Sequence, residues 1–502
     1  MKTQLFRLHP ARLAALTLTL ALALPGCGDD DVDPTPDARV PDSSTASPDS
    51  SLATPDASVL TPDATVVTPD AAAPLLDTDL VAVRFDANGS LDTTFGSAGV
   101  ARHSLSTVIT GGARDALWGL ARDSSNRLLL FGSRRGADTR LDADRAVVRL
   151  TASGGLDTSF ATGGVHTLNI ANLGDNARNG FVQADGKIVT SGYTAQPSGV
   201  GTQSINKVVL LRLNDDGTPD TTFGAGGIVN SMPLVPADPI NTPWGVAEAY
   251  VAARQTGRYV TAGYGRSAST GTVNMVSFGY TPAGRLDTSW GIQGVIELDV
   301  AGGDDRARNA IVLPDDRVLI LGSVVPSTGN VDAAAYLYTA SGQLDTSFNG
   351  TGYKTYGFGR PDEAWFGAAL SPDGLRVAAV GYRAGMEGGA AADDDATLLI
   401  WPVGTGTEFA QAVPLSDTAN DRFWGVTFDA AGKIYAAGYL EEGTDRRMVV
   451  VRFNPDGTRD TSFGTGGLAT HNVIARGTLE EARGVAIQSD GKVVIAGVAE
   501  TP

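Results

Sequence analysis

A short phrase, Leu-Asp-Thr-Ser-Phe-Gly, recurs through most of this chain of 502 residues and constrains its fold more than any other feature. Six copies, and a degenerate seventh at Thr407–Phe409, repeat at intervals of about 60 residues. The aromatic residues of the copies are Phe95, Phe160, Phe223, Trp290, Phe348, Phe409 and Phe463. A regular repeat of this length predicts an array of similar structural units.

Each repeat contains four short runs rich in Val, Ile and Leu, separated by Gly and Asp turns. In one repeat the first run follows Asn179-Gly180, a tight turn lies at Asp185-Gly186, and the later runs cover 187–192 and 208–213. No helical periodicity of useful length is present. This pattern predicts an all-β fold of four-stranded antiparallel sheets, and seven such sheets predict a seven-bladed β-propeller.

The phase of the repeat predicts how the ring closes. The repeats begin with the third and fourth runs of a unit, at 80–85 and 99–100, and end with its first and second runs, at 484–497. Neither end carries a complete blade. We expect the N-terminal strands to pair with the C-terminal strands in one blade, which removes the exposed sheet edges.

The phrase and the Asp-Gly-Lys-Val turn at 490–493 resemble the delta-60 repeat family of bacterial extracytoplasmic proteins. The resemblance covers residues 79–502. It implies a propeller-like fold and no established activity.

Residues 1–27 have the form of a bacterial lipoprotein signal peptide. A basic segment precedes an apolar run over 13–24, which is too short to span a bilayer. The run ends in Leu24-Pro25-Gly26-Cys27, which resembles a lipobox with Cys27 as the lipidated residue. Ordinary secretory cleavage is the alternative. We therefore expect the membrane to be a partner through lipid on Cys27, and an extracytoplasmic location at the bacterial outer membrane or cell surface.

Residues 28–76 form a separate region rich in Pro, Asp and Thr, with Pro every seventh residue from Pro41 to Pro69. Regular Pro excludes a helix, and the absence of aromatic residues excludes a core. We expect a disordered stalk with a reach on the order of 100 Å. The propeller then covers 77–502.

Charge and residue usage limit the partners and cofactors. The chain has a net charge of −18, which opposes binding to nucleic acid. It has one Cys, so disulfides within the chain are excluded. No catalytic or cofactor motif is present, and His103, His166 and His471 belong to different repeats, so we expect no catalytic residue, no cofactor and no metal site.

Acidic residues recur near the first run of most repeats, with Trp residues close to several of them. In a propeller the first strand lines the central channel, so these side chains are expected at the channel mouth, on the face with the long loops. The candidates are Asp115, Asp175, Asp305, Asp362, Asp421, Glu480, Trp118, Trp244, Trp365 and Trp424. Such a ring suits a polar ligand, for example a glycan or a peptide. The alternative is that the repeat copies these residues as scaffold.

The sequence favours a ligand-binding or protein-binding scaffold module at the cell envelope, with a glycan, a peptide or an envelope protein as partner. One alternative is an extracytoplasmic polysaccharide hydrolase or lyase that uses two of the channel-mouth carboxylates. A second alternative is a purely structural envelope protein.

Overall fold

Runs of Val, Ile, Leu and Ala form the strands of the structure, a computed structural model. It describes residues 77–500, without 107–113, 136–141, 198–203, 232–233, 235–245, 255, 266–271, 301, 327–328, 385, 388–389, 392, 417, 444 and 476. Within these residues every element is a strand, and no helix is long and apolar enough to cross a membrane. The predicted signal peptide, stalk and lipidated Cys27, and also Trp244, lie outside the described residues.

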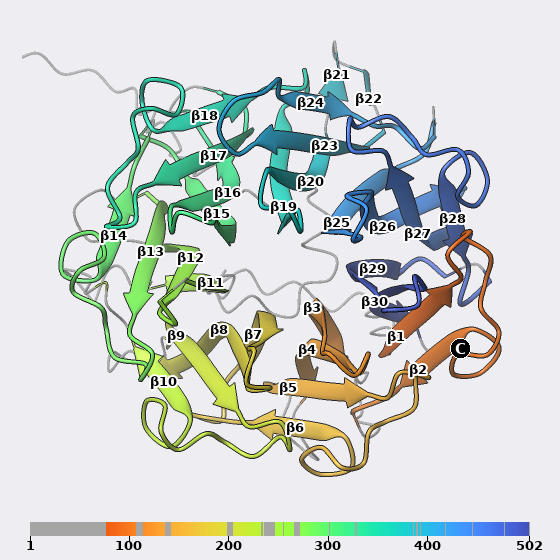
Figure 1. Ribbon diagram of the computed structural model, residues 1–502, viewed down its shortest axis with the longest axis horizontal. Coiled ribbons are helices and arrows are strands. Elements are labelled where there is room, and N and C mark those ends of the chain that lie inside the picture. Colours follow the sequence, from red (N-terminus) through yellow and green to blue (C-terminus); the bar gives the residue numbers. More distant parts are fainter. Residues whose placement is uncertain are drawn as a thin grey trace, which may run out of the picture. The chain divides into compact units, whose positions relative to one another are not determined.

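Seven four-stranded antiparallel sheets, called blades below, are arranged around a central axis (Figure 1). The innermost strand of each blade is given first. Blade 1 contains β3 (Ala116–Arg122), β4 (Leu128–Arg135), β5 (Ala143–Leu150) and β6 (Val165–Leu168). Blade 2 contains β7 (Asp175–Val182), β8 (Ile188–Pro197), β9 (Ser204–Leu213) and β10 (Ile228–Ser231). Blade 3 contains β11 (Val246–Ala253), β12 (Tyr259–Gly265), β13 (Asn274–Tyr280) and β14 (Val295–Leu298).

The remaining blades follow the same order. Blade 4 contains β15 (Asp305–Val312), β16 (Val318–Val324), β17 (Asp332–Tyr338) and β18 (Tyr353–Tyr356). Blade 5 contains β19 (Asp362–Leu370), β20 (Arg376–Ala384), β23 (Asp395–Pro402) and β24 (Phe409–Ala412), and a small sheet of β21 (Met386–Glu387) and β22 (Ala390–Ala391) intervenes in sequence. Blade 6 contains β25 (Asp421–Phe428), β26 (Ile434–Glu442), β27 (Asp445–Phe453) and β28 (Leu468–His471).

Blade 7 joins the two ends of the described chain. It contains β29 (Glu480–Ile487), β30 (Val493–Glu500), β1 (Thr78–Phe85) and β2 (Val100–His103). β1 pairs with β30 along its full length, from Thr78 opposite Glu500 to Phe85 opposite Val493. In Figure 1 the red and orange β1 and β2 lie beside the blue β29 and β30. The predicted seven-bladed propeller and its mode of closure are confirmed.

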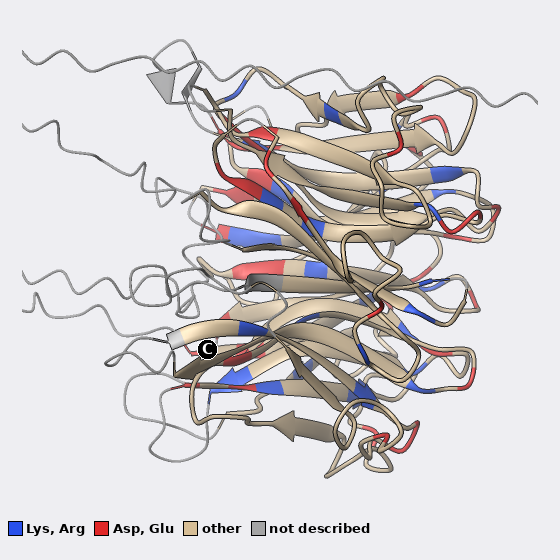
Figure 2. Ribbon diagram, turned by 90° about the vertical axis from the view of Figure 1, so that its left-hand side faces the viewer, with Lys and Arg blue, Asp and Glu red and all other residues tan. Residues whose placement is uncertain are grey.

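The hydrophobic core lies between blades. The cluster between blades 7 and 1, for example, joins Phe95 and Val494 to Leu128 and Leu130, and all four are at most 1% exposed. Charged residues gather near the ends of the strands, as Figure 2 shows from the side. Burial between blades therefore accounts for the apolar runs on both faces of each sheet.

The repeated phrase forms the turn between the third and fourth strands. Asp92 accepts hydrogen bonds from the Thr94 backbone N–H (3.1 Å) and hydroxyl (2.6 Å), which lower its pKa. It also pairs with Arg84 (2.9 Å) and Lys492 (3.0 Å), and the Arg84 guanidinium lies over the Phe95 ring. The equivalent aspartates of five other blades accept the same backbone hydrogen bond; they are Asp157, Asp220, Asp287, Asp345 and Asp460.

A Gly residue of the next blade packs against the aromatic ring of the phrase. A Cβ atom added to Gly154 of blade 1 would lie 2.9 Å from the Phe95 ring, so only Gly lets the two blades approach this closely. The aromatic residue of the phrase therefore packs between neighbouring blades.

Blade 5 lacks the turn. Phe409 is the first residue of β24 and is not part of a turn like that of the phrase. The prediction that Thr407–Phe409 is a degenerate copy of the phrase is therefore wrong for the backbone conformation. Its ring nevertheless packs against Gly457 of the next blade, where an added Cβ atom would lie 2.8 Å away. The packing role of the aromatic residue is therefore kept without the turn.

Candidate functional site

The innermost strands of six blades carry a one-residue β-bulge at the same place. The residue before each bulge pairs with the Gly that follows the second apolar run, for example Leu117 with Gly132. In blade 3 the register shift of β11 lies elsewhere, between Val246 and Glu248. The bulged residues, here called the belt, are Trp118, Arg178, Arg308, Phe366, Trp424 and Arg483. Because a bulge re-aims a side chain, it places a large side chain at one level around the axis.

Belt side chains contact one another from blade to blade. The Arg483 guanidinium lies between two indole rings, 3.8 Å from the Trp424 centroid and 4.5 Å from the Trp118 centroid. Arg178 lies over the Trp118 ring at 4.3 Å. On the other side, the Trp424 and Phe366 rings meet edge to face at 4.4 Å. Desolvated cation–π contacts of this kind stabilise by about 1–2 kcal/mol each.

Arg308 of blade 4 is the last residue of the belt, and its guanidinium lies 4.7 Å from the centroid of the Phe366 ring.

The residue that follows each bulge contacts the innermost strand of the neighbouring blade. A Cβ atom added to Gly484 would lie 2.5 Å from the Leu120 Cβ atom, so the innermost strands of blades 7 and 1 are in close contact. In blade 2 the residue is Asn179, whose amide donates to Val251 O (3.0 Å) and accepts from Val251 N (2.8 Å). The side chain thus pairs with the free edge of β11.

A central cavity of about 370 Å³ lies against the belt. Trp118, Phe366, Trp424 and Arg483 line it, together with residues of all seven innermost strands that follow the bulge level. The lining reaches the last residues of these strands, such as Val312, so the cavity extends toward the turns between first and second strands. Its lining contains no Asp or Glu.

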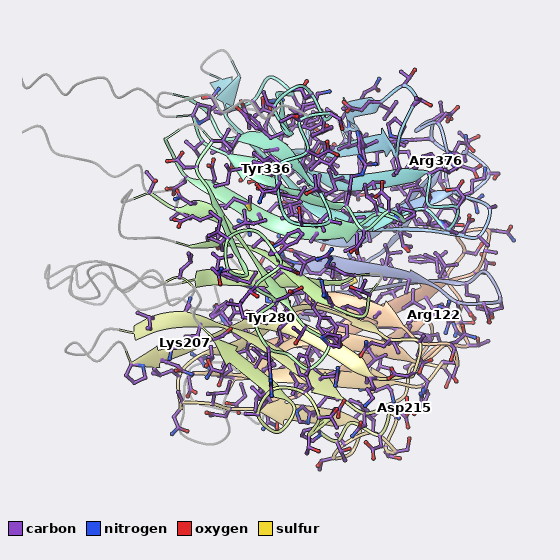
Figure 3. All side chains as sticks on the ribbon, turned by 60° about the vertical axis from the view of Figure 1, so that its left-hand side comes forward. Arg122, Lys207, Asp215, Tyr280, Tyr336 and Arg376 are labelled. Atoms are coloured by element: carbon purple, nitrogen blue, oxygen red, sulfur yellow. The ribbon has the colours of Figure 1, made fainter. Side chains whose placement is uncertain are left out.

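The cavity therefore extends toward the face of the tight turns, opposite the long-loop face on which the sequence analysis placed the site. Figure 3 shows the two faces: Arg122, Asp215 and Arg376 lie at the end with the tight turns, and Lys207 lies toward the other end. Arg122 ends β3, which contributes to the cavity wall.

The predicted acidic residues lie at the start of the innermost strands, and most of their carboxylates accept backbone hydrogen bonds. Asp421, for example, accepts from Ala396 N (2.8 Å) and Leu415 N (2.9 Å), and so joins blade 6 to blade 5. The corresponding bonds of other blades come from the connection before each innermost strand. They reach Asp115 from Leu105 N, Asp175 from Ile170 N, Asp305 from Val300 N, and Glu480 from Val473 N.

Burial changes the acidity of these residues. It raises the pKa of Asp115, Asp305, Asp421 and Glu480 to about 7, against the opposing effect of the backbone N–H groups. It also raises the pKa of Asp175. None of them lines the central cavity.

Blade 5 places Glu363, not Asp362, in this role. Glu363 accepts from Phe358 N (2.7 Å) and Arg360 N (2.9 Å). Asp362 instead accepts from the Tyr382 hydroxyl (3.0 Å). Sequence reasoning had no means to choose between the adjacent acids, because only the strand register decides which one faces the connection.

The Trp candidates separate into two groups. Trp118 and Trp424 line the central cavity. Trp365 is fully buried and packs edge to face against Tyr356 and Phe358, so it lies in the core between blades 4 and 5. Trp244 lies outside the described residues.

Sequence analysis did not identify Arg308 and Phe366 as belt residues. Alignment of the repeats on their Gly residues hides Arg308, because Gly180 of blade 2 and Ala310 of blade 4 stand one place beyond the position of Gly119. Phe366 precedes Gly367 as Trp118 precedes Gly119, so its position is visible in the sequence, although it is neither a Trp nor an acidic residue. The shared pair Arg178-Asn179 and Arg308-Asn309 is the signal that corrects the alignment.

Metal binding finds no support among the described residues. They contain no group of three or more His, Cys, Asp or Glu side chains placed to hold an ion. His103, His166 and His471 lie on the outermost strands of blades 7, 1 and 6.

Comparison with known proteins supports the repeat family at a coarse level. Residues 77–95, 183–223 and 432–463 match the model of a domain of unknown function, DUF5122, described as a β-propeller. The chain is a β-propeller repeat protein. No curated protein matches this chain.

Solved structures similar to the propeller show low sequence identity and low TM-scores. A periplasmic gluconolactonase of Pseudomonas aeruginosa is 12% identical, with a TM-score of 0.39 over 79% of this chain and 99% of that one. A polysaccharide lyase is 10% identical, with a TM-score of 0.43 over 85% and 100%. The β-propeller domain of a protease from Pyrococcus furiosus is 10% identical, with a TM-score of 0.39 over 78% and 91%. At this level the similarities say nothing about activity.

Proposed function

We propose that this chain is a lipid-anchored, extracytoplasmic β-propeller that binds a polar ligand, such as a glycan or a peptide, in its central cavity without chemical turnover. We further propose that its repeats are of the delta-60 kind, on the basis of the Leu-Asp-Thr-Ser-Phe-Gly phrase. The stalk over 28–76 would hold the propeller away from the membrane that carries the lipid on Cys27.

The observation that carries the binding proposal is the belt beside the central cavity. Trp118, Trp424 and Arg483 are fixed by mutual contacts before any ligand arrives. A cavity of about 370 Å³ falls within the range of small-ligand sites, roughly 300–1,000 Å³. Preorganised aromatic and charged groups lower the entropic cost of binding.

The placement of the acidic residues favours binding over glycoside cleavage. A glycosidase needs two carboxyl groups facing the substrate, about 5–10 Å apart. Here the first-strand carboxylates Asp115, Asp175, Asp305, Asp421 and Glu480 accept backbone hydrogen bonds and do not line the cavity. A purely structural role remains the alternative if no ligand exists.

A glycan and peptide array probed with the full chain tests the binding proposal. We expect saturable binding that Trp118→Ala weakens about tenfold or more. Trp401→Phe is the matched control, because Trp401 of blade 5 packs against Phe348 of blade 4 and does not line the cavity. A blank array would overturn the proposal, as would product release from a bound polysaccharide.

The anchor is tested separately in the native host or a bacterial expression host. We expect the protein to take up labelled fatty acid and to enter the detergent phase on phase separation, and Cys27→Ser to abolish both. Partition of the unmodified chain into the aqueous phase would contradict the proposed anchor.

A further inference from the structure

We infer that a groove of blade 5 binds residues 54–65 of the same chain, whose sequence resembles the phrase that this blade lacks. The inference goes beyond the proposed function, because it concerns the rim of the propeller and not the central cavity. It leaves residues 28–53 as the spacer to the membrane. Its basis is a set of seven equivalent cations, one of which has no phrase aspartate, and a matching sequence in the N-terminal region.

A cation stands at the start of the second strand in every blade. In six blades it forms an ion pair with the phrase aspartate, as Lys187 does with Asp220 at 2.7 Å. Arg376 is the seventh cation, and blade 5 has no phrase aspartate to pair with it. The other five pairs are Arg127–Asp157 (3.8 Å), Arg258–Asp287 (3.3 Å), Arg317–Asp345 (3.1 Å), Lys433–Asp460 (2.7 Å) and Lys492–Asp92 (3.0 Å).

Arg376 is as accessible as the other cations of this set. Its side chain is 28% exposed, against 25% for Arg317 and 31% for Lys492. It pairs with Asp373 of the adjacent turn at 3.4 Å. Arg317 and Lys492 also pair with an aspartate of the adjacent turn, at 2.7 and 3.6 Å, and contact their phrase aspartate as well. The local pair therefore does not prevent Arg376 from binding a second carboxylate.

The space beside Arg376 is a groove of about 360 Å³ at the border of blades 5 and 6. Among the described residues that line it, Arg376 is the only cation. Leu375, Phe409 and Pro455 give the groove an apolar wall, and Leu375 is 60% exposed. An occupant with an apolar ring and a carboxylate would cover this wall and pair with the guanidinium.

The two acids in the lining of the groove already have partners. Asp373 pairs with Arg376, and one oxygen of Asp456 accepts hydrogen bonds from the Thr458 N–H (3.0 Å) and hydroxyl (2.7 Å). The phrase aspartates of other blades also lie beside such turn acids, since Arg127 contacts both Asp157 and Asp215. The acids therefore do not exclude an acidic occupant.

The phrase of blade 2 shows which sequence can meet these needs. It reads Thr-Pro-Asp-Thr-Thr over residues 218–222, and Asp220 accepts hydrogen bonds from the N–H (3.0 Å) and hydroxyl (2.7 Å) of Thr222. The pattern Thr-Pro-Asp, any residue, then Thr or Ser occurs twice more, at 54–58 and 61–65, and both copies lie outside the described residues. Each copy supplies a proline ring for the apolar wall, a carboxylate for the cation, and a hydroxyl that can hold the carboxylate in a turn.

The chain is long enough for this contact. The strand β1 runs from Thr78 at the long-loop face to Phe85 at the tight-turn face, where the groove lies. Blade 6 alone separates blade 5 from blade 7 on that side of the ring (Figure 1). Binding of 54–58 leaves residues 59–77 as the connection, which reaches about 60 Å when extended. The length of β1 is about 25 Å. Tethering gives the segment an effective concentration on the order of millimolar, so a weak contact suffices.

Hydrogen–deuterium exchange of the full chain with millisecond labelling tests the inference. We expect the amides of 54–65 to exchange several-fold more slowly in the unmodified chain than in Arg376→Glu, which replaces the cation by an acid. Arg376→Lys should keep the slow exchange, because Lys fills this position in blades 2, 6 and 7. Arg122→Glu makes the same change of charge at the tight-turn end of blade 1 and should leave the exchange unchanged (Figure 3).

The aspartates of the two copies test the other side of the contact. We expect Asp56→Asn combined with Asp63→Asn to speed the exchange of 54–65 to the rate seen in Arg376→Glu. The same variant should speed exchange in the loop 403–408, which contributes to the groove. Asp70→Asn, in a Thr-Pro-Asp sequence that no Thr or Ser follows at the second position, is the control and should change neither rate.

Exchange of 54–65 at the rate of an unstructured peptide in the unmodified chain would overturn the inference. Slow exchange that Arg376→Glu leaves unchanged, or equal exchange in Arg376→Lys and Arg376→Glu, would overturn it too. Slow exchange that is lost on dilution would show that the groove binds a second copy, and would also overturn binding within the chain. Each of these outcomes leaves the proposed binding of a ligand in the central cavity standing.

Discussion

The pKa values of individual aspartates in this propeller are shifted in opposite directions because their surroundings differ. The phrase aspartate Asp92 faces Thr94, Lys492 and Arg84, and its pKa is lowered. The first-strand aspartate Asp421 is buried, and its pKa is raised to about 7 although it accepts backbone N–H groups. The first kind neutralises charge at the surface turns, and the second joins a buried connection to the innermost strand.

Replacement of Asp421 by Asn tests the second role. Both carboxylate oxygens accept backbone N–H groups, so the amide NH₂ of Asn would face a donor. We expect the free energy of unfolding to fall by about 1–3 kcal/mol, as for other unsatisfied buried polar groups. Denaturant unfolding followed by Trp fluorescence measures this change. Glu442→Gln, at a half-exposed ion pair, is the control and should cost less than about 1 kcal/mol; an equal cost in both variants would contradict the role.

Stability should also depend on pH near neutrality. Burial raises the folded-state pKa of Asp115, Asp305, Asp421 and Glu480 above the unfolded values, so the folded chain holds more protons. Their stabilising contribution is complete below the unfolded pKa and is lost as the pH rises through about 7. His166 has a lowered pKa and acts in the opposite sense, but only below its unfolded value of about 6.5.

Above pH 6.5 the effect of the buried acids is therefore separated from that of His166, and the phrase aspartates are ionised in both the folded and the unfolded state. We expect the free energy of unfolding to fall between pH 6.5 and 8, and the slope to be shallower in Asp421→Asn. Urea unfolding at four pH values in this range measures it. A free energy that is constant or rises with pH in the unmodified chain would show that these acids are ionised in the folded state.

At the scale of the strand and turn, blade 5 shows which residues of the repeat depend on one another. It lacks the phrase turn, and with it the phrase Asp. Pairing of β20 with β23 places Ile400 where β1 has Arg84, and Arg376 where Lys492 stands in blade 7. Leu375 is 60% exposed and lines a groove of about 360 Å³ with Pro402 and Phe409. The phrase aspartate and the arginine of the third strand are thus lost together, whereas the cation of the second strand is kept and pairs with Asp373 (3.4 Å).

This comparison predicts unequal effects of two matched substitutions. Lys492→Leu removes a partner of the 9% exposed Asp92, and we expect a loss of about 0.5–1 kcal/mol. Arg376→Leu removes the equivalent cation of blade 5, where no phrase Asp exists and the ion-pair partner Asp373 is half-exposed, and we expect a change within about 0.5 kcal/mol. Thermal unfolding of both variants measures the difference. Equal effects would mean that the phrase Asp does not depend on its second cation.

Strand boundaries show where sequence reasoning stopped. The sequence pattern predicted that the first strand of each blade starts after a Gly, but the strands start several residues earlier and continue through a bulge. The strand β3, for example, begins at Ala116 and not after Gly119. A bulge leaves no mark on apolar periodicity, since it inserts one residue into an otherwise regular run. The belt was therefore only partly predictable: Trp118 and Trp424 were found, and Phe366 and Arg308 were not.

At the scale of the whole molecule, the number and closure of the blades could be predicted, because they depend on repeat count and phase. The site depended on side-chain direction and on contacts between blades, which repeat spacing does not encode. Trp365 and Trp424 have similar sequence surroundings, yet one is core and the other lines the cavity because Trp424 is the bulged residue and Trp365 is not.

Because β1 and β30 close the ring, we expect the backbone amides to be protected from hydrogen exchange to a similar degree in all blades. Their eight paired residues join the ends of the described chain, and Val81, Val83 and Ile495 are fully buried. We expect amides of β1 and β30 to exchange with deuterium as slowly as those of β16 in blade 4, because the ring opens as one cooperative unit. Fast exchange confined to β1 and β2 would show that the closing blade opens independently.

The most direct test of ligand binding in the central cavity is hydrogen–deuterium exchange of the full chain with and without a saturating ligand from the glycan and peptide array. We expect new protection in the innermost strands β3, β25 and β29, which carry Trp118, Trp424 and Arg483, with little change in the outermost strands. Protection restricted to the outermost strands or to the groove of blade 5, with the innermost strands unchanged, would place the ligand outside the central cavity and contradict the proposed function.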